Sequence, residues 1–244
     1  MTPDLVDALD ADGLTCFVGA GGKKTTMYAL AAEHDRAVVT ATVRIPIFDP
    51  HVERVSITED PLATLLTARD WPLGLVPEQE FEDRYRGYEP ATVGEIGRAH
   101  DGPVLVKADG ARMRDFKAPG ENEPRIPDAA DTVVPIASAH VVGEPLSEEL
   151  VHRPECVAAV ADVDVGDEIT PETVGRVLAS PDGCLRGVPA NATVVPLVNK
   201  VDDDGDLVAA REIADAVLHH TDRAVVPRIV LAQMAGARVV DVVE

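Results

Sequence analysis

Apolar stretches alternate with amphipathic stretches along most of the chain. Short runs of consecutive apolar residues are typical of strands that are buried on both faces of a sheet. They predict strands at residues 14–18, 36–42, 103–108, 131–136, 193–198 and 224–231. Apolar residues at helical spacing predict helices at 61–69, 90–100 and 206–220. A further helix is predicted after the loop at 19–26 and continues to about residue 34. Another is predicted to begin at Pro171, with Thr170 as its N-cap, and to end before the residues 181–183.

Alternating strands and helices of this kind indicate an α/β fold. We predict a three-layer arrangement of the P-loop NTPase type, with a mainly parallel sheet covered by helices on both faces. In such folds ligands bind at the carboxyl ends of the strands. The 244 residues are expected to form a single nucleotide-binding domain, 1–244, interrupted by a polar, proline-rich segment at about 110–127. That segment is too long for an ordinary connection, which indicates a functional loop.

The N-terminal residues 1–12 are acidic and helix-like, with Leu5, Ala8 and Leu9 on one face, and so do not resemble a signal peptide. No apolar run approaches the roughly 20 residues needed to span a bilayer. The three cysteines are far apart and lack the spacing of a metal site. We therefore expect a cytoplasmic protein without a membrane partner.

The charge of the chain is strongly negative. It has 43 acidic and 22 basic residues, for a net charge of −21. This balance argues against nucleic acid and anionic membranes as partners, because phosphate groups require basic surfaces. Acidic residues are scattered along the chain, as expected for a halophilic protein whose self-repulsion is screened by salt.

Lysine is rare in this sequence and lies in three zones only. The five lysines are Lys23, Lys24, Lys107, Lys117 and Lys200. Two lie in the glycine-rich loop, two flank the string "ADGARMRDF", and one lies in "NKVD". Since lysine is ordinarily a surface residue, its loss elsewhere indicates that the retained lysines serve a purpose beyond solubility.

The string "GAGGKKTT" joins the first strand to a helix and allows three interpretations. A dinucleotide-binding turn needs a third glycine where Lys24 stands, and an acid at the end of the second strand, which "VVTAT" lacks. A simple tight bend leaves two lysines at a helix N-terminus, where cations oppose the helix dipole. A variant phosphate loop accounts for them, and we favour it, although its spelling departs from the usual G-x-x-x-x-G-K-[ST].

In a phosphate loop the backbone N–H groups from Gly21 to Thr25 would surround the phosphates, with Gly19 and Gly22 providing the turn. Lys23 or Lys24 would reach the terminal phosphate, and the hydroxyl of Thr25 or Thr26 would bind Mg²⁺. The spacing does not decide between the members of either pair.

Asp109 ends the apolar strand "VLVKAD", where phosphate-loop proteins place a carboxylate that holds or orders Mg²⁺. The alternative is an aspartate that caps the next turn, with Gly110 in the bend. Thr40 and Thr42 end the second strand; they either add a hydroxyl to the same site or serve only as β-branched strand residues.

Asn199-Lys200-Val201-Asp202 follows a late strand and matches the guanine-reading sequence N-K-x-D of GTP-binding proteins. In that interpretation Asp202 accepts two donors from guanine, and Asn199 and Lys200 shape the pocket. The alternative is a plain turn before the helix at 206–220. GTP and ATP therefore both remain candidate ligands.

Several strings, in order, resemble the YqeC-like family of accessory proteins of selenium-cofactor biosynthesis, which serve selenium-dependent molybdenum hydroxylases. The resemblance covers about residues 12–232 and rests on "VGAGGKKTTMYALA", "VLVKADGARMRDFKAPGENEPRIP", "VVGEPL", "VHRPE", "ITPETV", "SPDGCLRGVP" and "VVPLVNKVD". It implies a phosphate-loop nucleotide-binding protein. One departure is Lys107, which stands where an acid is expected, so the chain lacks a second acidic Mg²⁺ ligand there.

Together these features predict an NTPase or phosphotransferase that uses Mg²⁺ with GTP or ATP. Lys24, Asp109, Arg112 and Lys117 are the candidate catalytic residues; Arg112, Lys117 and Arg114 would form a cationic rim for a small anionic acceptor or for transition-state charge. The resemblance adds the maturation of a selenium- or molybdenum-containing cofactor, with a molybdenum hydroxylase as client. The alternative is a non-catalytic nucleotide switch that acts as a chaperone or carrier for a client metalloenzyme.

Overall fold

The computed structural model describes residues 4–244 and is built around one ten-stranded sheet. Along the main path the strand order is β15-β14-β13-β10-β1-β8-β2-β5-β4, and β12 also pairs with β10. The pairings within this sheet are parallel except that of β14 with β15 at one edge. Its strands are β1 (Leu14–Gly19), β2 (Val38–Ala41), β4 (Arg54–Ile57), β5 (Leu73–Val76), β8 (Val104–Lys107), β10 (Thr132–Ser138), β12 (Thr193–Val194), β13 (Leu197–Asn199), β14 (Ile229–Gln233) and β15 (Arg238–Val243).

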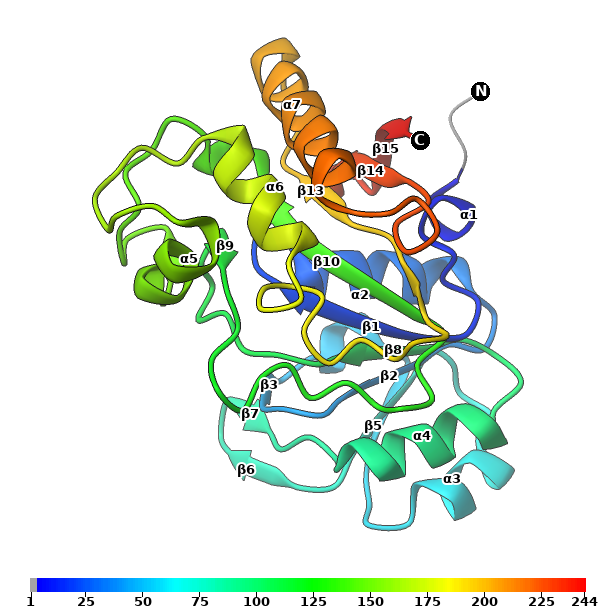
Figure 1. Cartoon of the computed structure of the whole chain (residues 1–244). Coiled ribbons are helices and arrows are strands. Elements are labelled where there is room, and N and C mark those ends of the chain that lie inside the picture. The colour runs from blue at the N-terminus through cyan, green and yellow to red at the C-terminus, as the bar shows by residue number, and fades with distance from the viewer. Residues whose placement is uncertain (1–3) are drawn as a thin grey trace.

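Helices cover both faces of the sheet and give three layers (Figure 1). One face packs through Phe17, Leu105 and Val134 against α1 (Leu5–Leu9) and α2 (Lys23–Glu33). The opposite face packs against α3 (Pro61–Thr67) and α4 (Pro90–Ala99) on one half of the sheet. On the other half it packs against α6 (Pro171–Ala179) and α7 (Asp204–His220). The predicted α/β class with a mainly parallel sheet is thus confirmed, and the layers are consistent with a P-loop NTPase-like fold.

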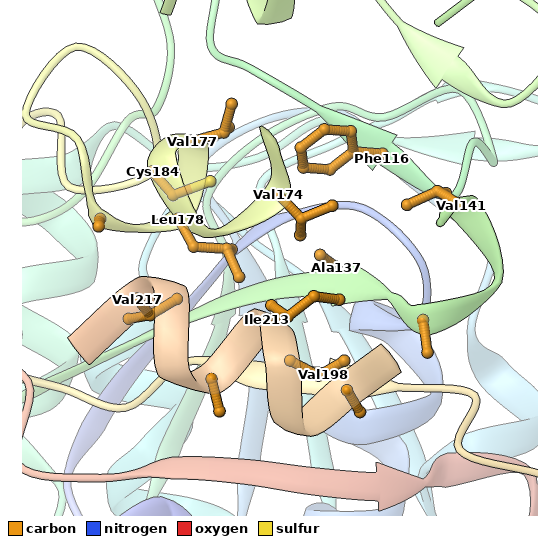
Figure 2. Packing of buried hydrophobic residues seen from close by; sticks show 14 of the residues in the cluster. Phe116, Ala137, Val141, Val174, Val177, Leu178, Cys184, Val198, Ile213 and Val217 are labelled. Carbon is orange, nitrogen blue, oxygen red and sulfur yellow. The ribbon is translucent and has the colours of Figure 1, made fainter. Parts of the chain in front are cut away.

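The largest helix contact lies over β10, where α6 and α7 enclose an apolar cluster (Figure 2). Val174 and Leu178 of α6 lie opposite Ile213 and Val217 of α7, and Ala137 of β10 lies between Val174 and Ile213 in this view. All five side chains are fully buried. This packing fixes the carboxyl ends of β10 and β13, which border the candidate site described below.

Most predicted elements are present, and two strands differ from the prediction. The strand predicted at 193–198 is two strands, because Pro196 has no N–H to donate to the ladder. The strand predicted at 224–231 begins only at Ile229, since Val225 and Val226 donate to the carbonyl oxygen of Asp222 in a turn. Leu5, Ala8 and Leu9 are buried on α1, as predicted, whereas residues 1–3 of the predicted N-terminal helix lie outside the described residues.

Several short elements were not predicted from the pattern. They are β3 (Ile45–Pro46), β6 (Gln79–Phe81), β7 (Arg84–Tyr85), β9 (Phe116–Lys117), β11 (Val151–His152) and α5 (Pro154–Ala161), together with β4, β5 and the antiparallel edge strand β15. Two to four residues are too few to show a periodicity. In the part of the chain that the structure describes, no helix is long and apolar enough to cross a membrane.

Candidate functional site

The glycine-rich loop joins β1 to α2 at the carboxyl edge of the sheet. Gly21 and Gly22 have φ values of 86° and 144°, which residues with a side chain rarely adopt. A Cβ at Gly21 would lie 2.8 Å from the carbonyl oxygen of Asp115, and one at Gly22 would collide with the side chain of Asn199. The two glycines therefore permit the tight turn and the close approach of two other loops.

Helix α2 begins at Lys23, directly after the N-cap Gly22, which provides no side-chain cap. The first turn holds Lys23, Lys24 and Thr25 but no acidic residue. Since the first N–H groups of a helix have no intrahelical acceptor, this end offers backbone donors, and two lysines stand in its first turn. Such an arrangement suits an anion.

The structure distinguishes the two lysines of the loop. The Lys23 side chain turns back into the loop, where its ammonium donates to the carbonyl oxygen of Gly19 and lies 2.7 Å from Asp109 Oδ1. Lys24 is half-buried and forms no ion pair within residues 4–244. Burial lowers the pKa of Lys23, and the charge of Asp109 opposes that effect.

The two threonines of the loop also differ. The Thr26 hydroxyl is buried and donates to the carbonyl oxygen of Gly22 at 3.1 Å, whereas Thr25 is exposed. Thr40 and Thr42 are buried and donate to the carbonyl oxygens of Leu75 and Arg125 at 2.7 and 2.6 Å. Thr25 therefore offers the accessible hydroxyl of the loop, and the strand threonines serve the local structure.

Asp109 lies just beyond β8, the strand next to β1, and is only 1% exposed. Its Oδ2 accepts the N–H of Gly19 at 2.8 Å and lies 3.0 Å from the Lys117 ammonium, while Oδ1 faces Lys23. Burial alone would raise the pKa of Asp109, but the charges of Lys23 and Lys117 hold it below its ordinary value. The carboxylate is therefore ionised and enclosed by donors.

Lys117 lies in the interior of the 110–127 segment, not on an exposed rim. It is 1% exposed, donates to the carbonyl oxygen of Gly110 at 2.7 Å and pairs with Glu123 at 2.8 Å. Glu123 also accepts the N–H of Gly110 at 3.1 Å and pairs with Arg153 at 2.6 Å. Burial opposes ionisation of Glu123, but these cations lower its pKa to about 2.

Glu123 and Arg153 were not identified as site residues from the sequence. Their contact depends on β9, which carries Lys117, pairing with β11, which ends directly before Arg153. Both residues occur in the strings "GENEP" and "VHRPE" that carry the family resemblance. Those strings were the only signal that could have pointed to them.

Arg112 and Arg114 are exposed on a segment that lies against the glycine loop. The carbonyl oxygen of Arg114 accepts the N–H of Gly21 at 3.1 Å, and that of Asp115 accepts the N–H of Ser138 at 3.1 Å. The two arginine side chains are exposed, and their backbone lies next to the loop. Their role as a cationic rim stays a prediction.

Asn199 ties the predicted base-reading loop to the glycine loop. Its amide nitrogen donates to the carbonyl oxygen of Gly21 at 2.6 Å, and its amide oxygen accepts the N–H of Met234 at 2.9 Å. Lys200 pairs with Asp115 at 2.6 Å. Both ends of the Asn199 amide are therefore used within the protein, and its role in this state is to position the loop.

Asp202 is exposed beside His140 and Asp206, and its Oδ2 lies 3.2 Å from His140 Nε2. Its other oxygen accepts the side-chain N–H of Gln233 at 2.9 Å. Guanine would have to share or replace these partners. Guanine recognition at Asp202 stays a prediction.

The carboxylates near the loop do not suit a directly bound Mg²⁺. The ion prefers octahedral oxygen ligands and keeps several waters, but Asp109 is enclosed by an N–H group and two ammonium groups. The space between Asp109, Lys117 and Cys184 is too narrow for a water molecule. Within residues 4–244 the one convergent group of potential metal ligands is His140, Asp202 and Asp206, which does not include Asp109.

A groove away from the loop lies between β4 and α3 at the edge of the sheet. It has a volume of about 420 Å³ and is lined by Arg54, Ser56, Thr64 and Arg69, among others, none of them in the glycine loop. Its lining includes one exposed ion pair, Arg54 with Asp70 at 3.7 Å, but none of the site residues predicted from the sequence.

Comparisons with known proteins identify the family of the chain. The family described as "YqeC protein" matches residues 15–155, which include the glycine loop, Asp109, Lys117, Glu123 and Arg153. The chain is also 24% identical over 215 residues to "Uncharacterized protein YqeC" of Escherichia coli (strain K12), which covers 85% of this chain and 84% of that protein. No solved structure matches the chain. Because the family match spans more than half of the chain, the protein belongs to the YqeC family.

Proposed function

We propose that the protein binds a nucleoside triphosphate, with its phosphates at the N-terminus of α2. The observation that supports this most is the uncapped start of α2, where Lys23 and Lys24 stand in a first turn without any acid. The backbone N–H groups of Gly22 to Thr25 would surround the phosphates. Lys23 would exchange the Gly19 carbonyl oxygen for a phosphate oxygen.

The chemistry proposed for this site is hydrolysis or transfer of a phosphoryl group. Phosphoryl transfer needs positioned phosphates and stabilised charge more than a covalent catalyst. Lys24, Asp109, Lys117 and Arg112 are the proposed catalytic residues, and we propose that the exposed Arg112 and Arg114 bind an anionic acceptor.

A non-catalytic nucleotide switch is the second candidate. The direct contact of Gly21 with Arg114, and of Asn199 with Gly21, favours it, because a ligand at the loop would disturb both neighbouring segments. The two candidates differ in turnover: an enzyme releases many equivalents of phosphate per protein chain without a client, and a switch does not.

The cellular role that we propose follows from the family resemblance. The chain resembles the YqeC-like family of accessory proteins of selenium-cofactor biosynthesis. We therefore propose that its nucleotide binding or hydrolysis serves the maturation of a selenium- or molybdenum-containing cofactor or hydroxylase. A molybdenum hydroxylase is the proposed client. Co-purification of such an enzyme in a selenium-replete host, dependent on nucleotide, tests this role.

Removal of both loop lysines tests phosphate binding. The Lys23→Ala/Lys24→Ala variant should show no measurable binding of ATP or GTP by calorimetry. The matched control is Arg54→Ala/Arg211→Ala, which makes the same change in net charge at exposed surface ion pairs. Unchanged affinity in the loop variant, with the melting temperature as a check of folding, would contradict the proposal.

A single substitution keeps this test valid if loss of the buried Lys23–Asp109 pair prevents folding. Lys24 is half-buried and makes no ion pair within residues 4–244, so Lys24→Ala should fold normally. We expect it to weaken nucleotide binding by about tenfold, or about 1.4 kcal/mol.

A further inference from the structure

We propose that this site binds its phosphate ligand without a divalent metal ion, because buried lysines hold the carboxylates and provide the positive charge that an ion would provide. The inference rests on the proposed nucleotide binding at the loop. It concerns which cations neutralise the phosphates, and it assigns that role to Lys23, Lys107 and Lys117.

Both oxygens of Asp109 already face buried cationic or N–H groups, although Oδ1 accepts no hydrogen bond and is held only by the charge of Lys23. Oδ2 is shared by the Gly19 N–H at 2.8 Å and the Lys117 ammonium at 3.0 Å, and Oδ1 lies 2.7 Å from the Lys23 ammonium. An ion bound directly to Asp109 would have to separate these buried pairs. Separation of a buried ion pair is unfavourable, because it leaves desolvated charges without partners.

The other nearby carboxylate, that of Glu123, is also neutralised. Its Oε2 lies 2.8 Å from the Lys117 ammonium and 2.6 Å from Arg153, and its Oε1 accepts the Gly110 N–H. The space beside Asp109 and Lys117 has no room for the waters that Mg²⁺ keeps.

Basic residues outnumber carboxylates in this cluster. The three buried lysines Lys23, Lys107 and Lys117 and the half-buried Arg153 lie near only two carboxylates, Asp109 and Glu123. Lys107 is 7% exposed, donates to the carbonyl oxygen of Arg44 at 2.7 Å and forms no ion pair within the described residues. Burial and the nearby charge of Lys23 lower the pKa of Lys107 to about 7. Lys107 is therefore only partly protonated at neutral pH, and an anion beside it would favour its ammonium form.

A metal-dependent phosphate site combines its lysine with a hydroxyl or carboxylate ligand that holds the ion against the phosphates. Here the carboxylates are already paired, and the positive charge is built into β8, α2 and β9, which carry Lys107, Lys23 and Lys117.

Calorimetric titration of the intact protein with ATP, GTP and tripolyphosphate, in EDTA and in MgCl₂, tests the inference. KCl is kept high and constant, so that Mg²⁺ does not act through ionic strength on this acidic chain. The dissociation constant in EDTA should lie within about threefold of that in MgCl₂, which corresponds to less than about 1 kcal/mol. Binding that is about tenfold or more weaker in EDTA would overturn the inference. Absence of binding in both buffers would instead overturn the proposed nucleotide function.

Two variants sharpen the test. Lys107→Met removes the cation that lacks an ion-pair partner and leaves no carboxylate unpaired, so the protein should fold; its affinity in EDTA should fall by about tenfold. Arg54→Ala, with the same change in charge at the exposed β4 edge, is the control and should not change affinity. An affinity for tripolyphosphate that Lys107→Met leaves unchanged would contradict the role of buried charge.

Lys117→Met gives the converse readout. It removes one of the two donors at Asp109 Oδ2 and one of the two at Glu123 Oε2, which keep the Gly19 N–H and Arg153 as partners. The variant should therefore show a dependence on Mg²⁺ that the wild type lacks. Mn²⁺ binding, measured by electron paramagnetic resonance, should appear in this variant and be absent from the loop site of the wild type. The inference would be overturned if the wild type bound Mn²⁺ as well as Lys117→Met does, and if the single substitution Asp109→Asn abolished that binding.

Discussion

Neutralisation of Glu123 should destabilise the protein in a way that depends on pH. The carboxylate accepts the Gly110 N–H and pairs with Lys117 and Arg153 at 2.8 and 2.6 Å. In Glu123→Gln the side chain keeps its size and can still accept hydrogen bonds, but its charge is lost. The variant therefore isolates the charge of Glu123 from its shape.

The lowered pKa sets the magnitude of this effect. The pKa of Glu123 falls from 4.5 to about 2, with burial opposed by the charge of Lys117 and by hydrogen bonds from Lys117 and Arg153. A tenfold change in an ionisation constant is worth about 1.4 kcal/mol, so the full lowering corresponds to about 3.4 kcal/mol. Solvent screening at this partly exposed group reduces our expectation to about 2 kcal/mol at neutral pH.

The sign of the pH dependence follows from the direction of the shift. Because the folded pKa lies below the unfolded one, the stabilisation is fully present above pH 4.5 and is lost as the pH falls toward about 2. The difference in unfolding free energy between wild type and Glu123→Gln should therefore be largest at neutral pH and shrink below pH 4.5.

Urea denaturation at constant high KCl, followed by the fluorescence of the single tryptophan, Trp71, measures this difference at several pH values. Glu121→Gln is the matched control, since Glu121 is exposed in the same segment, and its effect should stay within about 0.5 kcal/mol. A difference that stays constant or widens on acidification would refute the reasoning, as would equal stability of Glu123→Gln and wild type at neutral pH.

Two further predictions concern the acidic surface and the base. With a net charge of −21, the melting temperature should climb as KCl rises from dilute to molar, because salt screens self-repulsion; a flat or falling curve would remove salt adaptation as the reason for the acidity. If Asp202 reads guanine, GTP should bind about tenfold or more tightly than ATP, since adenine leaves the carboxylate without its donors at a cost of about 1–3 kcal/mol. Asp202→Asn should then prefer XTP, and equal competition by ATP and GTP against one labelled nucleotide in the wild type would show that Asn199–Asp202 is only a turn.

Features encoded by neighbouring residues could be predicted from the sequence. The glycine loop, the strand before Asp109 and the helices α3, α4, α6 and α7 each carry their signal within about ten consecutive positions. Asp109 lies next to the loop because β8 pairs directly with β1, and the carboxyl ends of parallel strands lie at the same edge of a sheet.

Features that depend on the path of the chain could not be predicted. Glu123 meets Arg153 only because β9 pairs with β11, and each of these strands is two residues long. The two lysines of the loop are equivalent in the sequence, and the phase of α2 separates them by directing Lys23 toward Asp109. In the same way, the contact of Asn199 with Gly21 joins loops 178 residues apart.

A crystal structure of the protein grown with ATP or GTP, once in MgCl₂ and once in EDTA, tests the central claim most directly. We predict phosphate density at the N-terminus of α2 in both crystals, in contact with the N–H groups of Gly22 to Thr25 and with the Lys23 ammonium. Asp109 should remain within hydrogen-bonding distance of Lys117. Nucleotide bound at another surface, with the loop and the Lys23–Asp109 pair unchanged, would contradict the assignment of this loop as the phosphate site.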